Sequence, residues 1–233
     1  MDLDVQKMPI LKTSKLSTGI PDLDLIMEGG YNNPANFILI GPSGNEKAAF
    51  AYAFAAAAEK NENSYIICGN SSPADIIAKA GNMGIDLSEV HFVDCYSSTL
   101  GNSKPQSTDK ITIVPSPSAL NDISLALNEA IRESQGKKMR IIFDTLSTFV
   151  LYTSKDSMKK FLSVICGRLK NAGATTLFLV DEGVHDKQLL SLIEHGMDDT
   201  YSLIDKAGKI ELVLPDIDMS IPIRVGPGGV TII

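Results

Sequence analysis

The order of apolar and polar positions along the chain predicts alternating strands and helices. Short apolar runs, typical of buried strands, are separated by longer segments in which apolar residues recur at helical spacing. The expected strands cover residues 37–40, 64–68, 90–94, 139–144 and 175–180, and the expected helices cover residues 48–60, 73–83, 120–131, 158–169 and 186–195. Because helices between strands serve as crossover connections, the pattern indicates an α/β fold with a mostly parallel central sheet and helices on both faces.

Two regions depart from this alternation. Residues 97–118 are rich in Ser, Pro, Thr, Asn and Gly, and we interpret them as a surface excursion because the alternation resumes after them. From Asp199 onward the chain is strand-rich, with apolar segments at 201–204, 209–214, 221–225 and 230–233. This tail predicts antiparallel strands at the C-terminal edge of the sheet. With no repeat and no second core in the pattern, residues 1–233 are expected to form a single domain.

Composition narrows the class of protein. The chain has 233 residues, 44% of them hydrophobic, and its 28 acidic and 21 basic residues give a net charge of −7. These values exclude a disordered chain, a collagen-like fibre and a basic protein that coats nucleic acid. They leave open an acidic protein with a local basic groove, although nucleic-acid binding is not expected. The acidic start Met1–Asp4 has no apolar core and is not a signal peptide, and the apolar stretch 48–58 is too short to cross a membrane.

The cysteines and histidines point to a reducing cytoplasm. Cys68, Cys95 and Cys166 lie far apart without a Cys-x-x-Cys pair, and the histidines show no metal-ligand spacing. A disulfide scaffold or a protein-bound metal is therefore not expected.

The candidate chemistry lies at Gly41–Ala48, which reads Gly-Pro-Ser-Gly-Asn-Glu-Lys-Ala. A phosphate-binding loop, G-x-x-x-x-G-K-[ST], belongs at such a place between a buried strand and a helix. Glu46 replaces the second glycine, and its anionic side chain both obstructs and repels phosphate. Ala48 replaces the hydroxyl residue and offers no oxygen to Mg²⁺. The residues predicted to touch nucleotide are Gly41, Pro42, Ser43, Gly44, Asn45, Lys47 and Asp144.

Several of these residues have alternative interpretations. Asp144 ends an apolar strand, where a carboxylate either orients Mg²⁺ through water or caps the following turn. Lys47 either binds an anion or lies in solvent at the helix start. Glu46 lies near the positive end of a helix, and one hypothesis is that its carboxylate, assisted by Lys47, takes the place of the nucleotide's charge.

Motifs along nearly the whole chain resemble one known family. The segments that carry the resemblance are Leu16–Asp24, Glu28–Gly30, Asn70–Ile76, Phe143–Ser147, Pro222–Arg224 and Gly228–Val230, together with the loop Gly41–Ala48. In this order they resemble the KaiC-like branch of the RecA-type ATPases. The resemblance implies a three-layer RecA-like P-loop fold. It also implies a homo-oligomer or a hetero-oligomer with another protein, because such relatives commonly form rings or pair with other subunits.

The same resemblance indicates what this chain lacks. In the family, a glutamate just before the Ser-Pro acts on the attacking water, whereas this chain reads Gly69-Asn70-Ser71. With Glu46 and Ala48, three parts of the machinery are altered together. We therefore expect no catalytic residues, weakened ATP binding, doubtful Mg²⁺ binding, and a regulatory or assembly role. The alternatives are an ATPase that hydrolyses slowly through Gly41–Lys47 and Asp144, and a DNA-binding recombinase relative, against which the acidic balance argues.

Four further features have a structural and a functional interpretation. Asp181 and Glu182 follow a strand expected beside that of Asp144, and turn capping is favoured over a relocated acid or a nucleotide sensor. His185 lies nearby and could act in the same cleft. Gly226–Gly229 is expected to form a hairpin turn. The basic residues around Arg140 are expected to form a solvated face.

Overall fold

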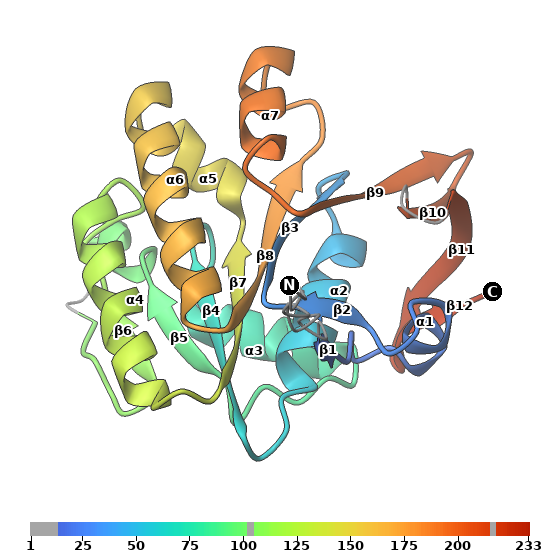
Figure 1. Cartoon of the computed structure of the whole chain (residues 1–233), viewed down its shortest axis with the longest axis horizontal. Helices are drawn as coiled ribbons and strands as arrows, with labels where there is room; N and C mark the ends of the chain where they lie inside the picture. The colour runs from blue at the N-terminus through green and yellow to red at the C-terminus, as the bar shows by residue number, and fades with distance from the viewer. Residues whose placement is uncertain (1–13, 102–104, 215–217) are drawn as a thin grey trace, which may run out of the picture.

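One large sheet runs through the part of the chain that the computed structural model describes, residues 14–101, 105–214 and 218–233 (Figure 1). In these residues its order is β12-β11-β10-β9-β3-β8-β7-β4-β5-β6. The strands are β3 (Ala35–Gly41), β4 (Glu62–Cys68), β5 (His91–Asp94), β6 (Ile111–Ile113), β7 (Lys138–Asp144), β8 (Ala174–Asp181), β9 (Asp199–Lys206), β10 (Lys209–Leu214), β11 (Met219–Gly226) and β12 (Gly229–Ile232). Neighbours from β9 through β3 to β6 are parallel, whereas β9 to β12 pair antiparallel.

Helices cover both faces of this sheet (Figure 1). On one face lie α1 (Pro21–Ile26), α2 (Asn45–Ala56) and α3 (Pro73–Asn82), which share one apolar core with the sheet. On the other lie α4 (Leu120–Ser134), α5 (Leu146–Leu151), α6 (Lys155–Asn171) and α7 (Lys187–Glu194), which share the second core. The predicted three-layer α/β fold, with a mostly parallel sheet and antiparallel C-terminal strands, is confirmed.

Helix α2 occupies the centre of its layer. Its residues from Lys47 to Ala55 are all buried, so the helix has no solvent-facing polar stripe. Alanine forms helices well and has a small side chain, which lets α2 pack closely against the sheet. It contacts β7 and β4 below and β11 and β12 beside it. Helix α2 therefore packs against segments from distant parts of the chain.

Local signals placed several elements correctly. The Ser72 hydroxyl accepts a hydrogen bond from the backbone N–H of Asp75 at the start of α3, as its position before Pro73 predicts. Gly226 pairs with Gly229 across the end of the β11–β12 hairpin, which confirms the expected turn. In the 97–118 excursion, a short 3₁₀ helix at Ser97–Leu100 precedes β6, which joins the sheet as its edge strand beside β5.

Other elements differ from the expectation. Strands β1 (Ser14–Leu16) and β2 (Tyr31–Asn33) form a separate antiparallel ribbon that the apolar pattern did not predict, and neither α1 nor α5 was expected. The segment Met1–Asp4, which the sequence predicts not to be a signal peptide, lies outside the described residues. In the described residues, no helix is long and apolar enough to span a bilayer, and no group of three or more metal-ligating side chains occurs.

Arg140 contradicts the expected solvated face. Its side chain is only 1% exposed and forms an ion pair with Glu62, with Nη2 2.8 Å from the carboxylate. Its Nη1 donates to the backbone oxygens of Ser17 (2.7 Å) and Phe54 (3.0 Å). The interpretation failed because Arg140 lies within β7, on the face that α2 covers. Its guanidinium therefore joins the β1–α1 connection to the end of α2.

Candidate functional site

The segment Gly41–Ala48 lies between a strand and a helix, as the sequence predicted. Gly41 ends β3, Gly44 is the N-cap of α2, and the helix begins at Asn45. A Cβ on Gly41 would lie 2.9 Å from the Cβ of Leu203 on β9, so only glycine fits here without a shift. Pro42 is half-buried, and Ser43, Gly44 and Asn45 are exposed. The middle of the loop is thus exposed to solvent, whereas Gly41 at its start is closely packed against β9.

Lys47 is bound within the protein. Its side chain is 3% exposed, and Nζ lies 2.6 Å from Asp181 Oδ1. Nζ also donates to the backbone oxygens of Val180 (3.0 Å) and Gly41 (3.2 Å). These three bonds use all three donors of the ammonium group. The interpretation of Lys47 as a solvent-exposed lysine is therefore wrong: it binds an anion, and that anion is a carboxylate of its own chain.

Asp181 is the hydrogen-bond acceptor that joins the loop to β8. It ends β8 beside Gly41, and the Ser43 and Thr145 hydroxyls each donate to its carboxylate at 3.2 Å. Partial burial opposes ionisation of Asp181, but the hydrogen bond and charge of Lys47 outweigh it and lower the pKa of the carboxyl. The favoured turn-capping interpretation is wrong for Asp181, because parallel pairing of β3 with β8 brings this acid to the loop instead.

Asp144 lies deeper than its neighbour. It ends β7, is 6% exposed, and accepts a hydrogen bond of 3.1 Å from the hydroxyl of Tyr52. Burial raises the pKa of Asp144, and the Tyr52 bond and the charges of Lys79 and Lys47 oppose that rise. The side chain binds α2 rather than the following turn. Sequence reasoning missed Tyr52, although it is the one residue of α2 after Lys47 with a hydrogen-bonding side chain.

The two departures from the loop pattern have different surroundings. The Glu46 side chain folds back over the loop, because its Oε2 lies 2.7 Å from the position of a Cβ on Gly44. Its carboxylate accepts no hydrogen bond from the described residues, and Asp181 rather than Glu46 holds Lys47. The hypothesis that Lys47 assists Glu46 is therefore wrong. Ala48 is buried and presents only a methyl group.

The neighbouring loop after β4 carries no acid. Gly69–Ser72 contains no carboxylate, Asn70 is exposed, and the Ser72 hydroxyl donates to Asp75 at 2.6 Å. On the opposite side of the site, His185 Nε2 lies 2.8 Å from the hydroxyl of Ser147, which accepts from the backbone N–H of Asp181. His185 is thus joined to the site through Ser147. Its burial lowers the pKa of the imidazole, although the charges of Asp181 and Asp186 oppose this.

The donor set fits Mg-ATP only in part. Lys47 can contact phosphate if it exchanges Asp181 for the ligand, and the backbone N–H groups at the start of α2 suit an anion. For Mg²⁺, the loop offers no hydroxyl at Ala48, and the nearby side-chain oxygens are the carboxylates of Asp144 and Asp181 and the hydroxyls of Ser43 and Thr145. The predicted residues Gly41–Asn45, Lys47 and Asp144 do lie together, and that they bind nucleotide stays a prediction.

A glycine-containing loop between β3 and α2, with strand-end carboxylates beside its lysine, defines a P-loop domain of the RecA-like class. The family model for the KaiC ATPases matches residues 16–209. The chain therefore belongs to the KaiC family.

Curated relatives agree with this assignment. The chain is 26% identical over 215 residues to a UPF0273 protein of Pyrococcus horikoshii, covering 88% of this chain and 81% of the relative. A UPF0273 protein of Thermotoga maritima is 24% identical, with 88% and 81% covered. The circadian clock oscillator protein KaiC of Prochlorococcus marinus is 26% identical over 170 residues, or 72% of this chain. The match covers only 33% of that KaiC.

Proposed function

We propose that this KaiC-family domain has lost ATP hydrolysis and acts as a regulatory or assembly module. The observation that carries the proposal is the ion pair of Lys47 with Asp181. The lysine that would contact the terminal phosphates is buried, and its three donors are bound inside the protein. A nucleotide must therefore break this arrangement before it gains the lysine, which weakens binding.

The hydrolytic step lacks further groups. Ala48 supplies no hydroxyl to a metal ion, and Asn70 and Ser71 offer no carboxylate to polarise water. Glu46 adds a negative charge over Gly44, where a phosphate would need the loop. These three features act on binding, metal positioning and water activation, so a change at any one of them would not restore the reaction.

The module would act by association with a second copy or another protein. Such assembly is what the family resemblance implies, and it does not require the loop to turn over nucleotide. The second candidate function is slow ATP hydrolysis. It is favoured by the loop placement itself, because Lys47 and the two strand-end carboxylates still lie together.

Calorimetric titration with Mg-ATP, combined with a phosphate-release assay, separates the two functions. We expect weak binding and no release above the background of a Lys47→Ala variant. Micromolar affinity with phosphate release that Lys47→Ala abolishes would overturn the proposal in favour of the ATPase.

Restoring the loop tests the origin of the loss. The double change Glu46→Gly with Ala48→Thr should strengthen Mg-ATP binding, and turnover should appear only when Asn70→Glu is added. A circular-dichroism melt of each variant distinguishes lost folding from lost binding. If the double variant folds and binds no better than the parent, the loop residues are not what limits the site.

A further inference from the structure

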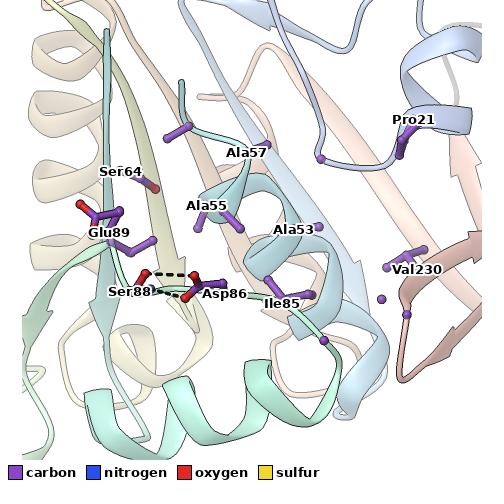
Figure 2. A pocket seen from close by; sticks show the side chains of 17 residues that line it. Pro21, Ala53, Ala55, Ala57, Ser64, Ile85, Asp86, Ser88, Glu89 and Val230 are labelled. Atoms are coloured by element: carbon purple, nitrogen blue, oxygen red, sulfur yellow. Dashed lines mark hydrogen bonds between the residues drawn. The ribbon is translucent and has the colours of Figure 1, made fainter. Parts of the chain in front are cut away.

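A pocket of about 480 Å³ lies at the C-terminal end of α2 (Figure 2). The helix has 12 residues, so the pocket is about 18 Å from the phosphate loop at its other end. Five segments far apart in the sequence form its walls. They are Gly19 and Pro21 at the start of α1, the alanine-rich end of α2, Ser64 on β4, residues 84–90 before β5, and residues 228–230 at the β11–β12 turn.

The charge of the pocket is negative. Asp86 and Glu89 are the charged side chains among the described residues that line it, and no lysine, arginine or histidine lines it. From outside the wall, Lys110 pairs with Glu89 at 3.1 Å and donates to the backbone oxygen of Ser88, so Asp86 is the lining carboxylate without an ion pair in the described residues. The last turn of α2 also contains no basic residue. The carbonyl groups at a helix C-terminus carry a partial negative charge and lack partners within the helix. Arg140 binds the carbonyl of Phe54, but that guanidinium does not line the pocket.

Ser64 supplies an independent sign of a missing partner. Its residue is 2% exposed, and its Oγ has no hydrogen-bond partner in the part of the chain that the structure describes. Figure 2 shows this oxygen directed from β4 toward the alanines of α2. A buried hydroxyl without a partner is costly, because folding removes it from water. It can donate one hydrogen bond and accept two.

Two glycines keep the walls of the pocket close together. A Cβ on Gly19 (φ +79°) would lie 2.1 Å from the backbone oxygen of Ala53, and one on Gly84 (φ +73°) would lie 2.3 Å from that of Pro227. At the rim, the Asp86 carboxylate accepts from the backbone N–H (2.8 Å) and the hydroxyl (3.0 Å) of Ser88 (Figure 2). The wall segments are therefore held in place by the backbone, and the alanines leave the space between them open.

We propose that this pocket binds a small aliphatic amine as its ammonium ion. An ammonium group has three donors, which match the Ser64 hydroxyl, a carbonyl at the end of α2 and the carboxylate of Asp86. The methylene groups of the ligand would pack against the alanines and the apolar side chains of Ile85 and Val230. The negative charge excludes phosphates, so this is a site separate from the phosphate loop.

Calorimetric titration of the full chain with 1,5-diaminopentane at low salt tests the proposal, with 1,5-pentanediol and glutarate as neutral and anionic analogues. We expect saturable binding of the diamine, at least about tenfold tighter than the diol because charged hydrogen bonds are stronger, and none of glutarate. Equal affinities for diamine and diol, or no saturable diamine binding up to about 10 mM, would overturn it.

A matched pair of variants locates the site. Ser64→Ala should weaken diamine binding about tenfold, because one hydrogen bond to the ammonium is lost. Thr176→Val is the control, since its hydroxyl is also buried without a partner in the described residues but faces the second core. It should leave diamine binding unchanged.

Both variants remove an unpartnered hydroxyl, so both should fold, which a thermal melt verifies. Ala57→Leu, which fills the pocket from the end of α2, should abolish diamine binding. Binding that survives Ala57→Leu, or that falls equally in Ser64→Ala and Thr176→Val, would place the amine elsewhere.

Discussion

The two ends of α2 differ in how their charge is balanced. At the N-terminal end, Lys47 and the carboxylate of Asp181 neutralise one another inside the protein. At the C-terminal end, Lys110 pairs with Glu89 and Arg140 binds the carbonyl of Phe54, but Asp86 has no ion pair among the described residues and the pocket wall holds no cationic side chain. A ligand at the N-terminal end must displace Asp181 from Lys47. At the C-terminal end, the proposed ammonium ligand would instead bind the Ser64 hydroxyl, an α2 carbonyl and the Asp86 carboxylate without displacing an ion pair. The phosphate-loop motif thus lies at the end of α2 where a ligand must first break an internal ion pair.

The largest effect is expected from breaking the internal pair. Asp181→Ala leaves the Lys47 ammonium buried without its carboxylate and should lower the free energy of unfolding by about 3 kcal/mol. The freed lysine should also bind phosphates, so ATP should stabilise the variant more than the parent. Urea denaturation with and without ATP measures both effects.

The control for this variant is Glu182→Ala, because Glu182 is exposed and adjacent. It should change stability by less than about 0.5 kcal/mol. If Asp181→Ala is as stable as the parent and gains no ATP response, the two ends of α2 do not differ in the way described.

A smaller loss of stability is expected when a glycine at either end of α2 is replaced by alanine. Gly19→Ala should cost about 2 kcal/mol or more, because its Cβ would meet the backbone of α2 at a positive φ. Gly44→Ala has an extended backbone, and its Cβ would meet only the movable Glu46 carboxylate at 2.7 Å. It should cost less than about 1 kcal/mol. Thermal melts of the two variants side by side decide this, and equal losses would show that the loop is as rigidly packed as the pocket.

The smallest effect depends on pH. Because burial raises the pKa of Asp144 above its ordinary value of 3.8, the folded chain holds this proton to higher pH than the unfolded chain does. The stability from this group is present at low pH and is lost as pH rises through the raised pKa. Asp144→Asn stays neutral, so it should be more stable than the parent at neutral pH, with the difference shrinking as pH falls toward 3.8.

Asp181→Asn should show the opposite slope. The lowered pKa of Asp181 gives stability that is present above 3.8 and is lost as pH falls through the lower folded value. This variant should therefore be less stable than the parent at neutral pH and approach it in acid. Denaturation curves from neutral to acid pH check both variants, and parallel slopes would contradict the assigned charges.

Much of the fold could be predicted because its signals are local. The apolar runs gave the strands of the parallel sheet, and the Ser72–Pro73 pair gave the start of α3. Short elements escaped because three residues of β1 or six of α1 are too few to show a period. Arg140 was misjudged because a charged residue beside two lysines looks like a surface, and only the position of α2 shows that it is buried.

The site divides in the same way. Gly41, Lys47 and Asp144 were predicted because a motif and a strand end mark them in the sequence. The pairing of Asp181 with Lys47 was not, because it depends on β8 lying beside β3 rather than on any spacing along the chain. Five distant segments make the proposed amine pocket, and the local sign of it in the sequence is a run of alanines, which also suits an ordinary buried helix.

The place of β3 in the sheet has a consequence for synthesis on the ribosome. This strand is made early, yet both of its neighbours, β8 and β9, come from residues 174–206. Until they emerge, the nascent chain exposes an unpaired apolar strand and the alanine-rich and phenylalanine-containing α2, a state that favours aggregation and chaperone binding. The pair of Lys47 with Asp181 cannot form before residue 181 leaves the exit tunnel, so assembly of the phosphate loop belongs to the late steps of folding.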